Sequence, residues 1–268
     1  MFQTILTIPG RINFLSLSQY SSLSERTFRR WFSRGIELLT LNIELLLSTL
    51  KKINQREWII AIDSVILEKS GKATYGLCRL WSSTVKSLIN GIEFHCISLV
   101  DITAQTAFHL TAKQIISNDE QTKIEAYLHQ LDTVKENLLA HTIYMVADGF
   151  YAKKSFIDGV TEMGFVLISK LRCDADLRYI YKGVQRKGRG RKRKYEGKVN
   201  PENRKGFNYI GMEANYKIYE GVFYGIRFKR NIKVVKLEEN ETGVITLLFS
   251  TDLKVPAKTI AKYYHYRF

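Results

Sequence analysis

The sequence predicts an α/β protein with a helical N-terminal region and a β-rich segment in its second half. Apolar residues are dense at helical spacing between residues 12 and 50, and between residues 58 and 170 short β-type runs alternate with two helical patterns. Between residues 207 and 253 further β-type runs follow one another, separated by turn signals. One part of the chain is therefore expected to be helical, one mixed and one mainly β.

Size and charge narrow the class of protein. The chain has 268 residues, enough to bury a substantial core, and a formal net charge of +15. Residues 182–205 contain eleven Lys or Arg against Glu196 and Glu202, so this segment alone supplies nine of those charges. Such a surplus favours a polyanionic partner, of which nucleic acid is the commonest. A solvated basic loop is the alternative interpretation.

Other classes are disfavoured by the pattern of apolar residues and cysteines. The longest apolar stretches, 36–50 and 58–67, are broken by acidic residues, so neither is expected to span a bilayer. The N-terminus lacks the pattern of a secretion signal. The three cysteines lie far apart, which argues against a disulfide framework or a CxxC metal site and makes a reducing cytosol the simplest compartment.

The N-terminal region is expected to contain several helices. Ser24 is a suitable N-cap for residues 25–34, and residues 35–53 are apolar enough to bury most of a helix. The first of these helices is rich in arginine and aromatic residues, as the recognition helix of a helix-turn-helix could be. A packed helical subdomain is the preferred interpretation.

The mixed part is expected to contain three strands, a helix, a strand, a helix and a strand. In chain order these segments cover 58–67, 93–102, 106–113, 117–141, 142–149, 152–163 and 165–169. Ser117 or Asn118 is the expected cap of the first helix. An antiparallel meander followed by strands returning through helices is the succession of the ribonuclease H-like fold, one of several α/β layer sandwiches that this order permits. In that arrangement the first and fourth strands lie side by side.

The β-rich part is expected to form further strands and to end in a helix. The predicted strands cover 207–219, 221–230, 232–237 and 244–253, with "EENETG" as a turn. Pro256 has the fixed φ that suits a first helical position, so a last helix is expected to begin there.

Two aspartates are the candidate catalytic and metal-binding residues. If the first and fourth strands pair, Asp63 and Asp148 approach each other, and two close carboxylates repel unless a cation lies between them. Mg²⁺ or Mn²⁺ fits carboxylate ligands, and two such ions roughly 4 Å apart can assist cleavage of a phosphodiester. The alternatives are a strand-end or bulge aspartate bonded to backbone amides for Asp63 and a turn-initiating aspartate for Asp148. Asp101 is expected to cap a hairpin, and the histidines show no zinc-type spacing.

Three segments resemble one known family. "AIDSVILEKSGKATYG" is similar to the first-aspartate block of DDE transposases of the insertion-sequence-four type, and "YMVADGFYAKKSFI" is similar to their second. "LLFSTDL" followed by "YYHYRF" resembles the segment leading into their third block, in which Tyr264 and Arg267 match a tyrosine and an arginine. The family's glutamate would fall four residues after Arg267, whereas the sequence given ends at Phe268.

The resemblance implies a function and a division of the chain. It implies a ribonuclease H-like core with an N-terminal helical region (1–54), a first core part (55–170), a basic and β-rich insertion (171–245) and a second core part (246–268). It also implies cut-and-paste transposition of double-stranded DNA, two divalent ions held by Asp63 and Asp148, and Tyr264 and Arg267 positioning DNA phosphate on one helix face. A homodimer associated with the prokaryotic nucleoid is expected, as is either a fragment of a longer enzyme or a decayed DNA-binding remnant.

The basic segment adds a second set of candidate residues. Salt-sensitive, sequence-independent DNA binding is expected from its densest part. These DNA-binding candidates are Arg189, Arg191, Lys192, Arg193 and Lys194.

Overall fold

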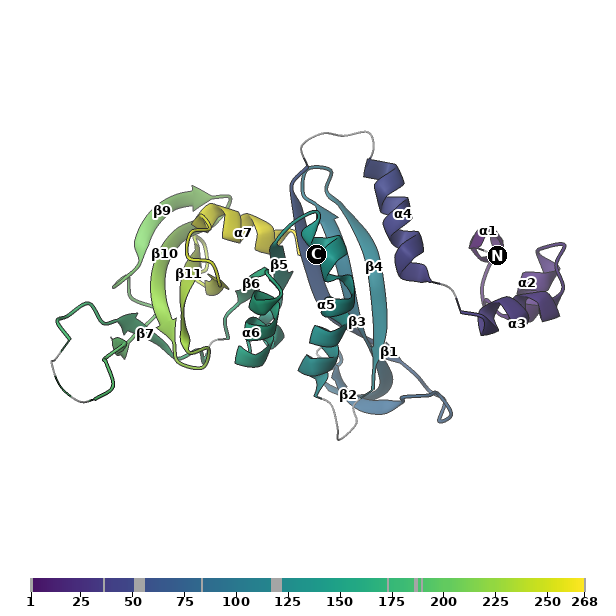
Figure 1. The fold of residues 1–268 in the computed structure, drawn as a ribbon, viewed down its shortest axis with the longest axis horizontal. Coiled ribbons are helices and arrows are strands. Elements are labelled where there is room, and N and C mark those ends of the chain that lie inside the picture. Colours follow the sequence, from purple (N-terminus) through teal and green to yellow (C-terminus); the bar gives the residue numbers. More distant parts are fainter. Residues whose placement is uncertain are drawn as a thin grey trace. The chain divides into compact units, whose positions relative to one another are not determined.

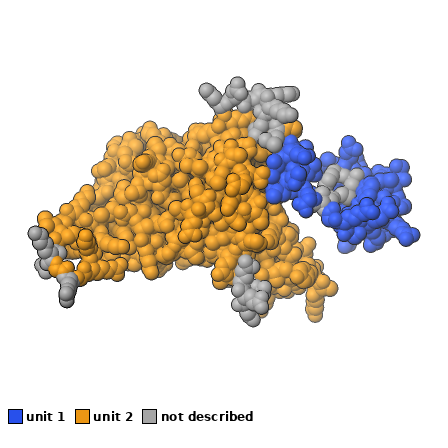
Figure 2. Space-filling model, viewed as in Figure 1, with its two compact units in different colours: residues 1–45 blue, residues 46–268 orange. Residues whose placement is uncertain are grey.

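A computed structural model describes residues 2–35, 37–50, 56–82, 84–116, 122–172, 174–185, 188 and 190–267 of the chain. The chain divides into two compact units, Met1–Leu45 and Leu46–Phe268, coloured blue and orange in Figure 2. Among the described residues, no helix combines the length and apolar character that crossing a membrane requires. The helices are α1 (Phe2–Thr7), α2 (Phe14–Gln19), α3 (Glu25–Ser33), α4 (Leu38–Leu50), α5 (Lys123–Leu139), α6 (Lys154–Glu162), α7 (Ala257–His265) and the short 3₁₀ helix η1 (Gly149–Tyr151).

The first unit begins with three short helices. Ser24 caps α3 as predicted, because its side chain accepts a hydrogen bond from the backbone N–H of Thr27. Phe28 of α3 is buried, and the rings of Phe14 and Phe32 meet edge to face with centroids 5.1 Å apart. Aromatic packing therefore joins α2 to α3, whereas α1 has no counterpart in the sequence pattern.

The second unit contains one mixed sheet of twelve strands (Figure 1). In space the order is β2-β3-β1-β5-β6-β12-β11-β10-β7-β8, with β4 also paired to β3 and β9 to β10. The strands are β1 (Trp58–Glu68), β2 (Cys78–Ser82), β3 (Ser87–Asp101), β4 (Thr106–Ile115), β5 (Tyr144–Ala147), β6 (Val166–Lys170), β7 (Leu177–Ile180), β8 (Tyr195–Lys198), β9 (Asn208–Glu213), β10 (Tyr216–Gly225), β11 (Arg230–Glu239) and β12 (Ile245–Ser250). The α/β class with a large mixed sheet is thereby confirmed.

The first half of the sheet follows the predicted order. β1 pairs antiparallel with β3 and parallel with β5, so the expected contact between the first and fourth predicted strands is confirmed. The helix α5 begins later than expected: Thr122 is its N-cap, in a capping box with Glu125. The caps expected at Ser117 or Asn118 are therefore wrong, and residues 117–121 lie outside the described part.

Helices α5 and α7 cover opposite faces of the sheet around β1. His95, the cross-strand partner of Ser64, stacks on Tyr127 of α5 with ring centroids 4.1 Å apart. Neighbouring residues of a strand point to opposite faces, so Asp63 faces away from α5. On that other face α7, yellow in Figure 1, packs against β5, β6, β10, β11 and β12 around the buried Ile260. Pro256 is the N-cap of α7 rather than its first residue.

The β-rich half differs from the prediction in its strand boundaries. The predicted break near Glu220 lies inside β10, and the true turns are at Ala214, which has a φ of 48°, and after Gly225. The strand needs glycine at position 221, because a Cβ there would stand only 2.5 Å from the carbonyl oxygen of Gly206. Strands β7 and β8 lie between residues 170 and 206, where the sequence pattern predicted no strand.

Candidate active site

Asp63 and Asp148 lie at the same edge of the sheet because β1 and β5 are parallel neighbours. Ile60 is opposite Met145 and Ala61 is opposite Val146. Each aspartate lies two residues beyond this last pair, so both carboxylates occur at the same level of the two strands. The sheet thus brings together two acidic groups that are 85 positions apart in the numbering.

The carboxylate of Asp63 is held in an environment that disfavours its charge. Its side chain is half-buried, and burial raises the pKa of the carboxyl group above its ordinary value. A backbone hydrogen bond from Ser64 N–H, 2.8 Å from Oδ1, opposes that rise in pKa. The charge of Asp148 raises the pKa further, and the charge of Arg267 lowers it. Electrostatic repulsion between the two aspartates is therefore a property of the fold.

Asp148 is positioned by the turn that follows β5. Its Oδ1 accepts a hydrogen bond from the backbone N–H of Phe150 at 2.8 Å and so caps η1. The hydroxyl of Ser169 on β6 donates to the carbonyl oxygen of Asp148 at 2.7 Å. Asp148 therefore has the turn role considered as its alternative. Asp63 lies inside β1 and not at a strand end or bulge, although its carboxylate also has a backbone N–H donor. In both aspartates the hydrogen bond is accepted by Oδ1. The other carboxylate oxygen, Oδ2, has no hydrogen-bond partner among the described residues.

Tyr264 and Arg267 lie beside this acidic pair. Burial raises the pKa of the Tyr264 hydroxyl; Arg267 opposes the rise, and Asp148 and Asp63 add to it. The guanidinium of Arg267 lies over the Tyr264 ring, 5.1 Å from its centroid. α7 ends at His265, and Arg267 follows the C-cap Tyr266, three positions beyond Tyr264. Arg267 therefore lies in the turn that directly follows α7.

A cavity of about 540 Å³ opens in front of Asp63 and contains residues that the sequence pattern did not single out. Cys96 lines it as the cross-strand partner of Asp63, and burial together with the Asp63 charge raises the pKa of its thiol. Gln105 also lines it and donates from Nε2 to the hydroxyl of Tyr266 at 3.2 Å. The register of β3 against β1 places Cys96 beside Asp63. This register cannot be read from the sequence alone, so the sequence pattern gave no signal for Cys96.

Asp101 has a structural role, as predicted. Its side chain is fully buried, pairs with Arg56 at 2.8 Å and accepts a hydrogen bond from Ala104 N–H at 2.9 Å. It therefore caps the turn between β3 and β4 and contributes nothing to the acidic pair.

The basic candidates lie elsewhere on the sheet. Arg191, Lys192, Arg193 and Lys194 are exposed between β7 and β8, while Arg189 lies outside the described residues. Five strands separate β1 from β7 in the order of the sheet. The structure thus groups Asp63, Asp148, Tyr264 and Arg267 and leaves the basic segment apart from them.

These features define an α/β protein with an acidic pair at one edge of a mixed sheet. The sequence profile of the family described as DDE superfamily endonuclease matches residues 3–206, more than half of the chain, and this range includes both aspartates. The chain belongs to this family. Comparison with curated proteins finds no match.

Two solved structures are similar to the chain at low levels. Endonuclease V from Bacillus subtilis has a TM-score of 0.36 and 11% identity, covering 76% of this chain and 69% of that one. Endonuclease V from Ciona intestinalis, in complex with a 24mer DNA containing an inosine followed by a ribo-adenosine, has a TM-score of 0.33 and 12% identity, with 90% and 88% covered. Similarity this low carries no inference about function.

Proposed function

We propose that this chain is a DNA transposase of the insertion-sequence-four type, which cleaves phosphodiester bonds at transposon ends and transfers the 3′ hydroxyl to target DNA. The carboxylate pair of Asp63 and Asp148 on adjacent parallel strands carries the proposal. Membership of the DDE superfamily endonucleases supports it, because the family description is that of a nuclease. The three blocks that resemble this transposase type supply the finer assignment.

We also propose that the core is ribonuclease H-like and that the chain divides at residues 54, 170 and 245. The support is the strand order β4-β3-β1-β5-β6, in which an antiparallel meander is followed by two parallel strands with α5 and α6 between them. The basic strands β7 to β11 then interrupt this core before β12 returns beside β6. This arrangement is the one expected for a core with an insertion.

The donor chemistry of the pair fits Mg²⁺ or Mn²⁺. Carboxylate oxygens are hard ligands. A cation would stabilise the charge of Asp63, whose pKa is raised by burial and, to a smaller extent, by Asp148. Within the part of the chain that the structure describes, no group of three or more His, Cys, Asp or Glu side chains could hold a metal. Asp63 and Asp148 would hold two ions together with water and DNA phosphate oxygens. When bound, the ions would activate an attacking oxygen and stabilise the leaving oxygen.

The protein's own residues then orient the DNA. Arg267 places a positive charge beside the two carboxylates, where it can bind a phosphate oxygen next to the scissile bond. The Tyr264 ring packs against that guanidinium in a cation–π contact. Water attacks the phosphorus, the bond from phosphorus to the 3′ oxygen breaks, and the products are a 3′ hydroxyl and a 5′ phosphate. The exposed Arg191, Lys192, Arg193 and Lys194 attract the DNA, and Arg189 belongs to the same segment.

Cleavage assays test the proposal directly. The 268-residue chain is incubated with DNA carrying candidate transposon ends and Mg²⁺ or Mn²⁺, beside Asp63→Asn and Asp148→Asn. Each substitution should reduce nicking roughly 100-fold or more, since a charge about 4 Å from a cation is worth about 4 kcal/mol at an effective dielectric constant of 20. Nicking that survives Asp63→Asn would refute the site.

A non-catalytic DNA-binding protein derived from such a transposase is the second candidate. One observation favours it: the described residues offer two clustered carboxylates and no third metal-binding side chain beside them. Salt-sensitive DNA binding without metal-dependent nicking by the wild-type chain would support this candidate over the transposase.

A further inference from the structure

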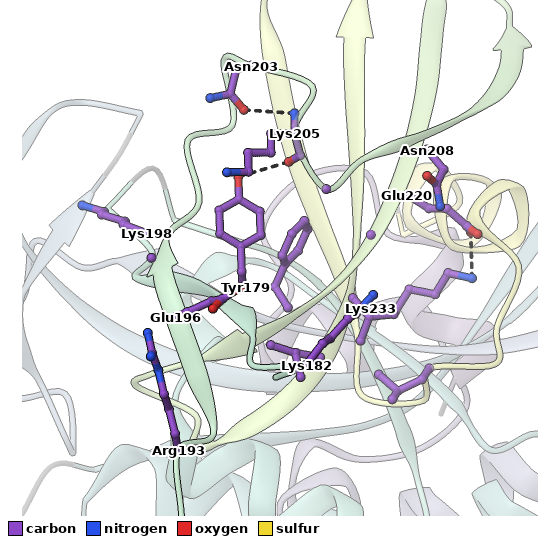
Figure 3. A pocket seen from close by; sticks show the side chains of 17 residues that line it. Tyr179, Lys182, Arg193, Glu196, Lys198, Asn203, Lys205, Asn208, Glu220 and Lys233 are labelled. Atoms are coloured by element: carbon purple, nitrogen blue, oxygen red, sulfur yellow. Dashed lines mark hydrogen bonds and ion pairs between the residues drawn. The ribbon is translucent and has the colours of Figure 1, made fainter. Parts of the chain in front are cut away.

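A second cavity of the second unit lies in its β-rich part and is larger than the one in front of Asp63. It has a volume of about 1090 Å³ and opens among β7, β8, β10 and the connection 199–207 (Figure 3). Below it is called the insertion groove. Its lining shares no residue with the cavity in front of Asp63.

The lining of the insertion groove is strongly basic. Five cationic and two acidic residues line it: Lys182, Arg193, Lys198, Lys205, Lys233, Glu196 and Glu220. Glu220 is neutralised by Lys233, with Nζ and Oε2 2.7 Å apart. Lys182, Lys198 and Lys205 form no ion pair with any described residue. Three of the cations are thus available to an anionic ligand. Arg193 adds a fourth, since its guanidinium contacts the carbonyl oxygen of Tyr195 and the Tyr181 ring and pairs with no described carboxylate.

The shape of the groove suits a chain of phosphates better than one small anion. The cations come from different segments, and Figure 3 shows Lys182, Arg193, Lys198 and Lys205 spread around the space rather than converging on one point. Three glycines also line the groove, Gly197, Gly206 and Gly221. A Cβ at Gly206 would stand 2.8 Å from the Tyr179 ring and one at Gly221 would stand 2.5 Å from the Gly206 carbonyl oxygen, so glycine allows the wall to pack closely.

We infer that the insertion groove binds the phosphodiester backbone of DNA at a site separate from the carboxylate pair. The inference deepens the proposed function, because it gives the transposase a second contact on the DNA that Asp63 and Asp148 cleave. It assigns binding to Lys182, Lys198 and Lys205, which lie outside the densest basic run 189–194. Backbone phosphates explain the lining, since lysines at several points carry affinity without reading sequence.

Equilibrium binding in EDTA tests the inference, because no cleavage occurs without metal. Fluorescence anisotropy is measured with duplex and single-stranded DNA of one sequence, using wild type and the triple variant Lys182→Gln, Lys198→Gln, Lys205→Gln. On duplex DNA the slope of log K against log salt should become shallower by about 2.7, at about 0.9 for each lost contact. Affinity at about 0.1 M salt should fall on the order of 100-fold. A loss on single-stranded DNA alone would assign the groove to a single strand.

A matched control removes the same charge elsewhere. Lys72, Lys86 and Lys113 are exposed and lie in the connections on either side of β2 and on β4. Their triple Gln variant has the same net charge as the groove variant. This control variant should keep most of the wild-type affinity for DNA. An equal loss in both variants would overturn the inference, because binding would then follow net charge alone. Loss of RNA binding with DNA binding intact would overturn it as well.

The two proposals fail in different ways. If the groove variant binds DNA like wild type while the wild-type chain nicks DNA, the groove is wrong and the transposase stands. If the groove variant loses binding while the wild-type chain never nicks DNA, the groove stands and catalysis is wrong. Thermal unfolding of each variant checks that the substitutions leave the fold intact.

Discussion

Two aspartates of the β1–β3 pair occupy opposite kinds of site, although they are only five positions apart along it. Asp101 lies opposite Trp58 on the β1–β3 pair, and Asp63 lies opposite Cys96. Asp101 is completely buried and paired with Arg56, while its other oxygen caps a turn. Asp63 is half-buried and faces a second carboxylate. The fold thus neutralises the charge of Asp101 with a cation, whereas it gives Asp63 a second negative charge as a neighbour.

The difference shows how a structural carboxylate can be told from a functional one. Folding supplies Asp101 with a cation and a backbone donor, so its charge is satisfied without any ligand. At Asp63 the fold supplies one backbone donor and an unfavourable neighbour. An arrangement that costs stability without a ligand is typical of binding and catalytic sites.

Removing the charge of Asp101 should destabilise the protein strongly. Asp101→Asn leaves the Arg56 guanidinium, only 7% exposed, without its carboxylate. Breaking a buried ion pair by removing one partner costs about 3–5 kcal/mol. Urea denaturation followed by tryptophan fluorescence measures the change in the free energy of unfolding.

The pair Lys135–Asp132 gives the control for this prediction. Both side chains are substantially exposed, so Asp132→Asn should leave the free energy of unfolding nearly unchanged. Equal stability losses in Asp101→Asn and Asp132→Asn would mean that burial does not distinguish the two pairs.

Divalent metal should stabilise the Asp63 site and leave the Asp101 site unaffected. At a Mn²⁺ concentration of about 100 Kd, binding to the native state alone adds about 2.7 kcal/mol to the free energy of unfolding. Wild type should therefore gain several degrees in Tm on addition of Mn²⁺, and lose them in EDTA. Asp63→Asn should show almost no gain, because one of the two carboxylates is lost.

Asp252→Asn is the matched control for the metal response. Asp252 is half-buried and follows β12, where its Oδ1 accepts a hydrogen bond from Lys254 N–H at 2.9 Å. Its removal should leave the Mn²⁺ response intact. A response lost in Asp252→Asn but kept in Asp63→Asn would place the metal elsewhere.

The sequence alone predicted the acidic pair better than its surroundings. The strands β1 and β5 are apolar runs whose period identifies them, and their order along the chain predicts that they pair, so Asp63 and Asp148 could be placed together. The contrast with Asp101 was predictable only in part, because its burial and its pairing with Arg56 depend on tertiary packing.

Other parts of the fold carry weak local signals. Strand β8 is "YEGK", with every residue exposed, so no apolar period marks it. The end of α7 at His265 has no glycine or proline beside it, and a helical continuation to Arg267 was therefore the natural expectation. The contact of Arg267 with Tyr264 is local, between residues three positions apart, and helical spacing is its signal in the sequence.

The smallest effect concerns the pH dependence of stability in the absence of metal. The native pKa of Asp63 is raised above the unfolded value of about 3.9, so the native state binds the proton more tightly. Stability from this group is complete below the unfolded pKa and is lost as the pH rises to the native pKa. In EDTA, wild type should thus lose stability relative to Asp63→Asn as the pH rises from the unfolded to the native pKa. Above the native pKa, the gap between the two free energies of unfolding should stay constant. Urea denaturation of both proteins between about pH 3.5 and 7.5 measures this gap.

One further variant separates the two causes of the raised Asp63 pKa, which are burial and the charge of Asp148. Asp148→Asn removes the repelling carboxylate but leaves the burial of Asp63 in place, which is the larger cause of its raised pKa. The same pH comparison in an Asp148→Asn background should therefore show a smaller change in the gap, although not its disappearance. An unchanged gap would mean that the two carboxylates do not interact. The pairing of Asp63 with Asp148, on which the contrast with Asp101 depends, would then be wrong.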